Sequence, residues 1–174
     1  AITSLPEQQR IVTLLDEAFD GIATARAHAE RNLQNARAIF ESHLLSVLLS
    51  KKWVWTTLGE LCEGVEYGTS AKSSPQGMVP VLRMGNIQDG KFDWGSLVYT
   101  DDKDEIAKYL LQHNDVLFNR TNSPELVGKT AIYKSEMPAI FAGYLIRIRR
   151  NERLLDGEFL NYFLNSQIAI DYGK

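Results

Sequence analysis

The fold of this protein is decided near its start, by residues 4–52: SLPEQQRIVTLLDEAFDGIATARAHAERNLQNARAIFESHLLSVLLSKK. Apolar residues recur every three or four positions along this stretch, which is the spacing of one helix face, and polar residues lie between them. Ser4 and Pro6 are typical of a helix start, and no proline interrupts the rest of the stretch. The pattern predicts one helix over residues 4–52, a rod of roughly 70 Å.

The apolar stripe of this helix needs a partner. So long a rod cannot lie wholly on the domain that the remaining residues can form, so much of the stripe would face water if the helix were alone. Because the stripe is rich in alanine, a second helix can approach closely, and we expect a coiled coil. Packing of the helix on its own domain is the alternative. The predicted helix interface consists of Leu15, Ala18, Ile22, Ala25, Ala29, Leu33, Ala36, Phe40, Leu44 and Val47.

The composition and the hydrophobic pattern of the sequence change after residue 52. Glycine and proline become frequent, and short β-prone runs appear at 79–84, 97–100, 115–118, 130–133 and 144–149. Asp89-Gly90 and Ser74-Pro75 are turn signals, and residues 104–111 and 156–167 have helical periodicity. The expected fold class is therefore α+β, with one long coiled-coil-forming helix (residues 1–52) followed by a mixed α/β domain (residues 53–174).

The bulk composition excludes several classes of protein. The chain has 174 residues, a hydrophobic fraction of 44% and a net charge of -3, which suits a packed domain and argues against a non-specific nucleic-acid binder. No apolar run has the length of a membrane span, so we expect no membrane association. Cys62 is the single cysteine, which excludes an internal disulfide and favours a cytoplasmic location.

The sequence contains no complete motif for catalysis or cofactor binding. The run VGKT at 127–130 lacks the first glycine of a phosphate-binding loop, because Ser123 stands at that position and Pro124 follows. The three histidines are too widely separated to suggest a metal site. The Asn/Asp-Pro-Pro-aromatic tetrapeptide of DNA amino-methyltransferases is also missing from the sequence. We therefore expect no catalytic residues, no metal and no cofactor in this chain.

Three polar segments remain as candidates for recognition: residues 67–74, residues 82–88 and residues 119–129. They combine glycines with hydroxyl, amide and cationic side chains, which are the groups that contact phosphates and base edges in DNA. Ordinary solvated loops are the alternative for each segment taken singly. The candidate DNA-binding residues are Tyr67, Thr69, Lys72, Ser73, Arg83, Asn86, Gln88, Lys91, Arg120, Thr121, Asn122, Ser123 and Lys129.

The candidates divide by chemistry. The arginine fork fits guanine and the amides fit adenine, so Arg83 and Arg120, together with Asn86, Gln88 and Asn122, are predicted to reach base edges. Lysines next to hydroxyl residues are predicted to contact phosphate; these are Lys72 and Lys129. The alternative for Arg83 is an internal ion pair with Asp89 or Asp93.

The order of several short motifs resembles type I restriction-modification specificity subunits. No single motif is specific, but together they cover nearly the whole chain. In chain order they are LPEQQRIV (5–12), WTTLGEL (55–61), VPVLRMGNI (79–87), DVLFNRT (115–121), VGK (127–129), FAGYLIRI (141–148) and FLNYFLNS (159–166).

The resemblance implies a role and partners. Such subunits are non-catalytic and carry two target-recognition domains, each of which reads half of a split site in double-stranded DNA. Their long helices act as a spacer and dock DNA methylation subunits, which bind S-adenosylmethionine, and restriction subunits add ATP-driven cleavage. This chain has one such helix (1–52) and one target-recognition domain (53–174), so we expect the helix to form a homodimer in isolation.

The end of the chain also departs from the family pattern. It stops at Lys174, before the polar glycine-containing stretch and the proline-rich segment that usually close such a domain. The chain is therefore expected to be a fragment or a half-size subunit with a truncated end. Two rival functions are a helical assembly protein without its own DNA readout and a stand-alone DNA-modifying enzyme.

Overall fold

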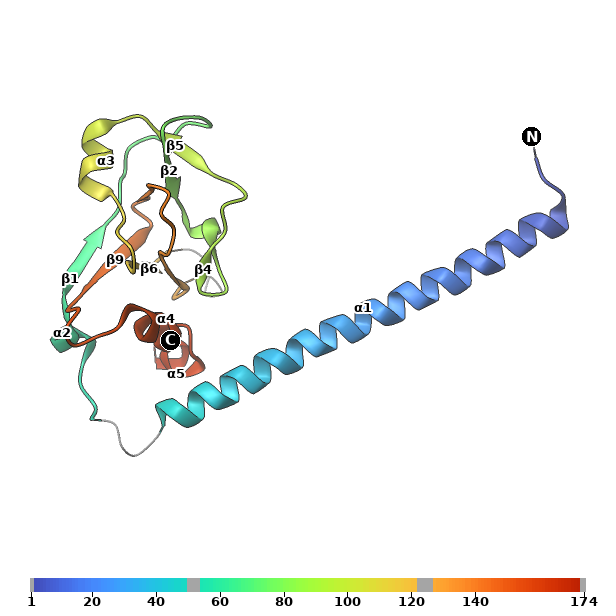
Figure 1. The fold of residues 1–174 in the computed structure, drawn as a ribbon, viewed down its shortest axis with the longest axis horizontal. Coiled ribbons are helices and arrows are strands. Elements are labelled where there is room, and N and C mark those ends of the chain that lie inside the picture. Colours follow the sequence, from blue (N-terminus) through green and yellow to red (C-terminus); the bar gives the residue numbers. More distant parts are fainter. Residues whose placement is uncertain (1, 50–53, 122–126, 173–174) are drawn as a thin grey trace. The chain divides into compact units, whose positions relative to one another are not determined.

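A computed structural model describes residues 2–49, 54–121 and 127–172. The chain divides into two compact units, residues 1–47 and 48–174. The first unit is the helix α1 (Leu5–Leu48), and the second contains short strands and helices (Figure 1). The expected fold class, a long helix followed by an α+β domain, is confirmed.

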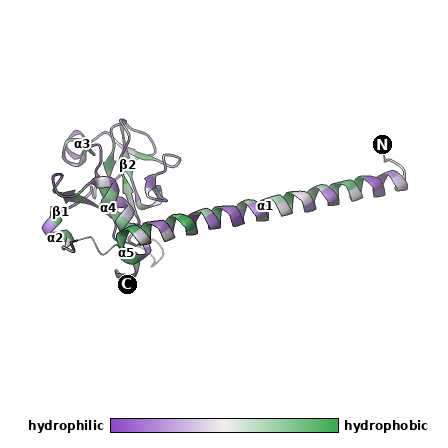
Figure 2. Ribbon diagram, turned by 60° about the horizontal axis from the view of Figure 1, so that its bottom comes forward, coloured by the Kyte–Doolittle hydropathy of each residue, from purple (hydrophilic) through white to green (hydrophobic). Residues whose placement is uncertain are grey.

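Helix α1 has its apolar residues in contact with solvent. Phe19 and Ile22 are each 63% exposed and Ile39 is 72% exposed, and apolar and polar residues alternate along the whole helix (Figure 2). The ion pairs Glu7–Arg10 and Arg26–Glu30 lie on the helix surface, and in each pair the two partners are about one helical turn apart. The helix begins at the residue after Ser4, as predicted, and ends at Leu48; Lys51 and Lys52 lie outside the described residues.

Two sheets form the frame of the second unit. A four-stranded antiparallel sheet has the order β1 (Cys62–Tyr67), β9 (Leu145–Arg150), β6 (Val116–Asn119) and β7 (Thr130–Ile132). A three-stranded sheet has the order β5 (Val98–Thr100), β2 (Val79–Leu82) and β8 (Ile140–Phe141), in which β2 and β8 are parallel. A short 3-10 turn, η1 (Met84–Asn86), follows β2.

The two remaining strands form a hairpin. It consists of β3 (Ile87–Gln88) and β4 (Lys91–Phe92), joined by the predicted Asp89-Gly90 turn. Both turn residues have positive φ, 48° at Asp89 and 77° at Gly90, which is the conformation that Asp-Gly supplies in a two-residue hairpin.

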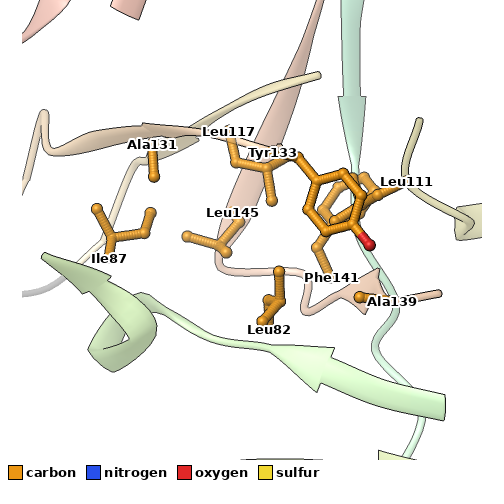
Figure 3. Packing of buried hydrophobic residues seen from close by; sticks show 9 residues of the cluster. All are labelled: Leu82, Ile87, Leu111, Leu117, Ala131, Tyr133, Ala139, Phe141 and Leu145. Atoms are coloured by element: carbon orange, nitrogen blue, oxygen red, sulfur yellow. The ribbon is translucent and has the colours of Figure 1, made fainter. Parts of the chain in front are cut away.

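Alternation along the strands places apolar residues on both faces of the four-stranded sheet. Leu117 packs with Leu82 of β2 and Phe141 of β8 in the cluster between the two sheets (Figure 3). Its neighbours Val116 and Phe118 point the other way, toward α4 (Gly157–Leu164). The period-2 pattern of strands therefore builds two core layers from one sheet.

Short helices close the domain. Residues of α3 (Lys103–Tyr109) cover the outer side of the three-stranded sheet. The helix α2 (Leu58–Leu61) leads into β1, and α5 (Gln167–Tyr172) follows α4. The side chains of Asp102 and Asp156 cap α3 and α4, because each accepts a hydrogen bond from a first-turn backbone N–H. Within the described ranges, no helix has both the length and the apolar character needed to cross a bilayer.

Candidate nucleic-acid interface

The turn formed by residues 141–145 connects the three predicted segments through main-chain hydrogen bonds. Thr69 N donates to Phe141 O at 2.8 Å, and Gly143 N donates back to Thr69 O at 2.7 Å. Ala142 N donates to Leu82 O at 2.9 Å, next to the segment 82–88. Arg120 N donates to Tyr144 O at 3.4 Å. Three segments that are far apart in the sequence are therefore attached, near their first residues, to the same five-residue turn.

Gly68 permits the closest of these approaches. A Cβ at this position would lie 2.2 Å from Phe141 O and 2.5 Å from Ala142 O, so no side chain fits. The glycine is required here by the contact between two main chains, not by a left-handed conformation. Without that contact, the segment 67–74 could not lie against the 141–145 turn.

The segment 67–74 is attached at both ends. Thr69 pairs with Ala142, and Ser74 exchanges two 2.8 Å main-chain hydrogen bonds with Tyr99 of β5. Between these attachments Lys72 is exposed and Ser73 is half-buried. Thr69 is only 5% exposed, and its hydroxyl donates to Glu105 of α3 and accepts from Ala71 N. Thr69 therefore holds the loop from inside the domain, and the structure does not favour its predicted contact with DNA.

The segment 82–88 contains both a buried and several exposed candidates. Asn86 is 3% exposed, and its amide donates to Asp93 O at 3.0 Å and Ser96 O at 3.2 Å while its oxygen accepts from Arg83 N at 2.9 Å. Because the hydrogen-bonding groups of its side chain are engaged inside the domain, Asn86 holds the segment from within, and the structure does not favour its predicted contact with a base edge.

Arg83 and Gln88 of the same segment, and Lys91 next to it, are accessible to a ligand. The Arg83 guanidinium extends from the end of β2 and donates to Ser96 O at 3.5 Å. Gln88 donates to Gly85 O at 3.1 Å, and Lys91 lies across the hairpin from it. All three side chains are exposed, so their predicted roles stay open to a DNA ligand.

The third segment continues from β6. Arg120 is exposed, and its guanidinium carbon lies 4.8 Å from the centre of the Tyr67 ring. Asn119 fixes the start of the segment, because its side chain donates to Thr121 O at 3.0 Å. Lys129 enters β7 beside Asn119, with its carbonyl accepting from Asn119 N at 2.9 Å. The predicted contacts Asn122 and Ser123 lie outside the described residues.

Two asparagines, one in α4 and one directly after it, support this region, and the sequence did not identify them as site residues. The buried Asn161 side chain accepts from Thr130 Oγ1 at 3.0 Å and donates to Gly90 O at 3.0 Å. Asn165 accepts from Thr130 N at 3.2 Å. Their bonds connect the hairpin turn, which lies between Gln88 and Lys91, with the strand that follows Lys129. The four-residue spacing of the asparagines on one face of a predicted helix was the available signal.

An ion cluster surrounds the buried Arg147, which follows the 141–145 turn by two residues. The Arg147 side chain is 6% exposed, and it donates to Glu66 Oε2 at 2.8 Å, Asp115 Oδ2 at 3.0 Å and Leu110 O at 2.9 Å. Its guanidinium carbon lies 5.4 Å from the Phe141 ring centre. Burial alone would raise the pKa of Glu66, but hydrogen bonds and charge from Arg147, with Arg149, outweigh it and lower that pKa.

The other end of β9 carries a separate polar groove. Its volume is about 520 Å³, and Arg149, Arg150 and Arg153 line it together with Glu63 and Glu152. Two of these cations are paired with acids, since Arg149 pairs with Glu66 and Arg150 pairs with Glu152. No group of three or more metal-ligating side chains occurs among the residues described. The 141–145 turn is therefore the better candidate for an interface.

The architecture defines a class: a long helix that precedes an α+β domain. The solved chains that share this fold include the following two. An HsdS subunit from Thermoanaerobacter tengcongensis superimposes with a TM-score of 0.54 at 19% identity, covering 97% of this chain and 44% of that chain. A chain from a structure described as the complex assembly and conformational transition of the type I R-M system gives 0.59 at 18% identity, covering 94% and 41%. No family model matches the sequence.

Sequence relatives give the particular family. The putative type I restriction enzyme MjaX specificity subunit of Methanocaldococcus jannaschii is 32% identical over 120 residues, which is 67% of this chain and 28% of that protein. The type I restriction enzyme StySPI specificity subunit of Salmonella potsdam is 28% identical over 181 aligned positions, 94% of this chain and 39% of that protein. The chain belongs to the type I restriction enzyme specificity subunits, and it spans less than half the length of these curated relatives.

Proposed function

We propose that this chain is a non-catalytic module that recognises one half of a bipartite sequence in double-stranded DNA. The observation that carries the proposal is the convergence of the segments 67–74, 82–88 and 119–129 on the 141–145 turn. Each segment alone is an ordinary polar loop. Together they bring exposed cations and amides to one end of a rigid pair of sheets, which suits readout of several adjacent base pairs.

The accessible side chains have different roles in the proposed recognition. The exposed Arg83, Arg120 and Gln88 suit base edges, whereas the exposed Lys72 and Lys91 and the half-buried Lys129 and Ser73 suit phosphate oxygens. Thr69 and Asn86 hold these segments from within the domain. The chain has a net charge of -3, so the phosphate contacts are few and the isolated chain is expected to bind DNA weakly.

Helix α1 is the proposed docking element for methylation subunits. Its support is the row of exposed apolar residues, such as Leu15, Ile22 and Leu33, which are 49%, 63% and 55% exposed. In the assembled system the methylation subunits bind S-adenosylmethionine, the restriction subunits use ATP, and this chain binds neither. Without these partners the same stripe is expected to pair with a second copy of the chain.

A mobility-shift experiment separates this proposal from the rival in which α1 is the whole function. Duplex DNA carrying the target is found by sequencing the methylome of a host that carries the intact system. The chain is then mixed with its methylation subunits and either that duplex or one with a scrambled half-site. Preference for the intact half-site, lost when Arg83 and Arg120 are replaced by alanine, supports DNA reading. Equal binding of both duplexes, with the assembly intact, supports a scaffold without readout.

A further inference from the structure

Tyr67 and Arg120 form a single unit at one end of the four-stranded sheet. The guanidinium carbon of Arg120 lies 4.8 Å from the ring centre of Tyr67, which is within cation–π range. Tyr67 ends β1, whereas Arg120 directly follows β6, and β9 runs between these two strands. The Arg120 side chain must therefore extend across β9 to reach the ring.

The register of the sheet accounts for this contact. Tyr67 pairs with Ile146 of β9, and Ile146 pairs with Phe118 of β6, so these residues form one row and point to the same face. Arg120 follows Phe118 by two positions, and strand alternation directs its side chain to that face as well. Its main chain is held by the 3.4 Å bond from Arg120 N to Tyr144 O.

The stack leaves the arginine fork accessible. Tyr67 is 52% exposed and Arg120 is exposed, so a ligand can reach the guanidinium while the ring supports it. A long arginine loses much rotamer freedom when it binds a planar partner, and a side chain that is already stacked has lost part of that freedom beforehand. The ring thus lowers the entropy cost of the contact that Arg120 makes.

We infer that Tyr67 is a positioning residue for specificity, which presents the Arg120 fork to a guanine in the major groove. The half-site then contains a G·C pair where Arg120 reads it, because guanine offers the O6 and N7 acceptors that match two N–H groups of the fork. This inference rests on the proposed function. In this inference Tyr67 acts by orienting Arg120 and does not itself contact a phosphate.

The test selects bound DNA from a random-sequence duplex library at low salt. The full chain is compared with Tyr67→Phe, which keeps the ring, and Tyr67→Leu, which removes it. Arg120→Lys keeps the charge but removes the fork, and Arg120→Ala removes both. The readouts are the enrichment of guanine at each position and the melting temperature of each variant. Because both side chains are exposed, the melting temperatures should stay the same.

The expected pattern is specific to one position. Tyr67→Phe should keep the guanine enrichment, and Tyr67→Leu should lower it about two- to fivefold, the factor that a surface cation–π contact contributes. Both Arg120 variants should abolish it. If Arg120→Ala abolishes the enrichment but Tyr67→Leu leaves it intact, Tyr67 has no positioning role. If Tyr67→Leu or Arg120→Ala weakens all sequences equally, that side chain contacts the DNA backbone and the inference is overturned.

Failure of the proposed function has a different signature. A native chain that enriches no motif, with its methylation subunits present as well as absent, does not read DNA, whatever the Tyr67 variants do. A native chain that enriches a motif in which Arg120→Ala changes nothing still reads DNA. In that case only the assignment of Tyr67 and Arg120 is wrong.

Discussion

Two phenylalanines mark the contrast between the two parts of this molecule: Phe19 of α1 is 63% exposed, whereas Phe141 of the following domain is fully buried. The domain packs its apolar residues between its own sheets and helices. Helix α1 satisfies its backbone hydrogen bonds locally but leaves its apolar stripe in water. The domain thus contains its own source of stability, while the helix is expected to need a second helix to cover its apolar stripe. The following predictions test that difference, starting with the largest effect.

Replacing Ala25 and Ala29 together with glutamate should abolish self-association of the chain. Both alanines lie on the predicted seam, where the substitution would bury four charges in a symmetric dimer. Light scattering at micromolar concentration should give twice the monomer mass for the native chain and the monomer mass for the variant.

The matched control places the same two charges on the other side of the helix. Ala27→Glu combined with Ala38→Glu lies roughly opposite the stripe at 100° per residue, and it should remain dimeric. Dissociation of both double variants, or a monomeric native chain, would contradict the proposed stripe pairing.

Replacing Arg147 with methionine should unfold the domain far more easily and leave α1 pairing unchanged. The substitution removes the cation between Glu66 and Asp115, and breaking a buried pair in this way costs about 3–5 kcal/mol. Urea denaturation followed by tryptophan fluorescence measures the loss. The control is Arg149→Met, which also contacts Glu66 but is 54% exposed and should have a small effect. Equal losses in the two variants would show that burial of the cluster is unimportant.

Replacing Gly68 with alanine should destabilise the domain by about 1–3 kcal/mol, as expected where a side chain is forced into a filled space. The new methyl would overlap Phe141 O, so the segment 67–74 must move away from the 141–145 turn. Gly85→Ala is the control, because nothing lies within 4 Å of a Cβ there. Thermal melting reports stability, and DNA binding should weaken for Gly68→Ala alone. A Gly68→Ala variant as stable as Gly85→Ala would refute the close approach.

Acidification should destabilise the domain partly through Glu66. Its pKa in the folded chain is below the ordinary value of 4.5, so the stabilisation is present above pH 4.5 and is lost as the pH falls through the folded pKa. Urea midpoints measured from pH 7 to pH 3 should fall less for Glu66→Gln than for the native chain. Glu63→Gln, an exposed change on the same strand, should follow the native curve.

Replacing Lys129 with alanine should have the smallest effect. Loss of one phosphate contact should weaken all DNA sequences alike and reduce the salt slope of binding by about one unit. Arg83→Ala should instead cost about 1–3 kcal/mol on the cognate site and relax one base position. A lower melting temperature with unchanged base preference would assign Arg83 to an internal ion pair. Anisotropy titrations at several salt concentrations give both quantities.

The sequence predicted those parts of the fold that depend on local pattern. The periodicity of residues 4–52 indicated α1, and apolar runs indicated β2, β6 and β9. Strand β1 was not predicted, because Glu63, Gly64 and Glu66 make it polar. Glu66 is tolerated there since Arg147 and Arg149, which come from β9 far along the chain, neutralise its charge. Such compensation depends on strand pairing and has no local signal.

The candidate site shows the same limit. The sequence identified three polar segments, but their meeting point depends on the parallel pairing of β8 with β2, which brings Ala142 beside Leu82. Nor could the sequence distinguish an inward from an outward polar residue. Asn86 and Gln88 are both amides in one segment, and only Asn86 is directed into the domain. The roles of the exposed candidates remain predictions.

The way in which the 141–145 turn holds the three segments has a consequence for evolution. The bonds described there join main-chain N–H and C=O groups, and these are the same for every amino acid other than proline. Side chains at exposed positions such as Lys72, Arg83 and Arg120 can therefore be exchanged without loss of the attachment points. Mutation can therefore diversify the outer residues while the frame persists. Under the proposed function, a few such substitutions would give the domain a new DNA target.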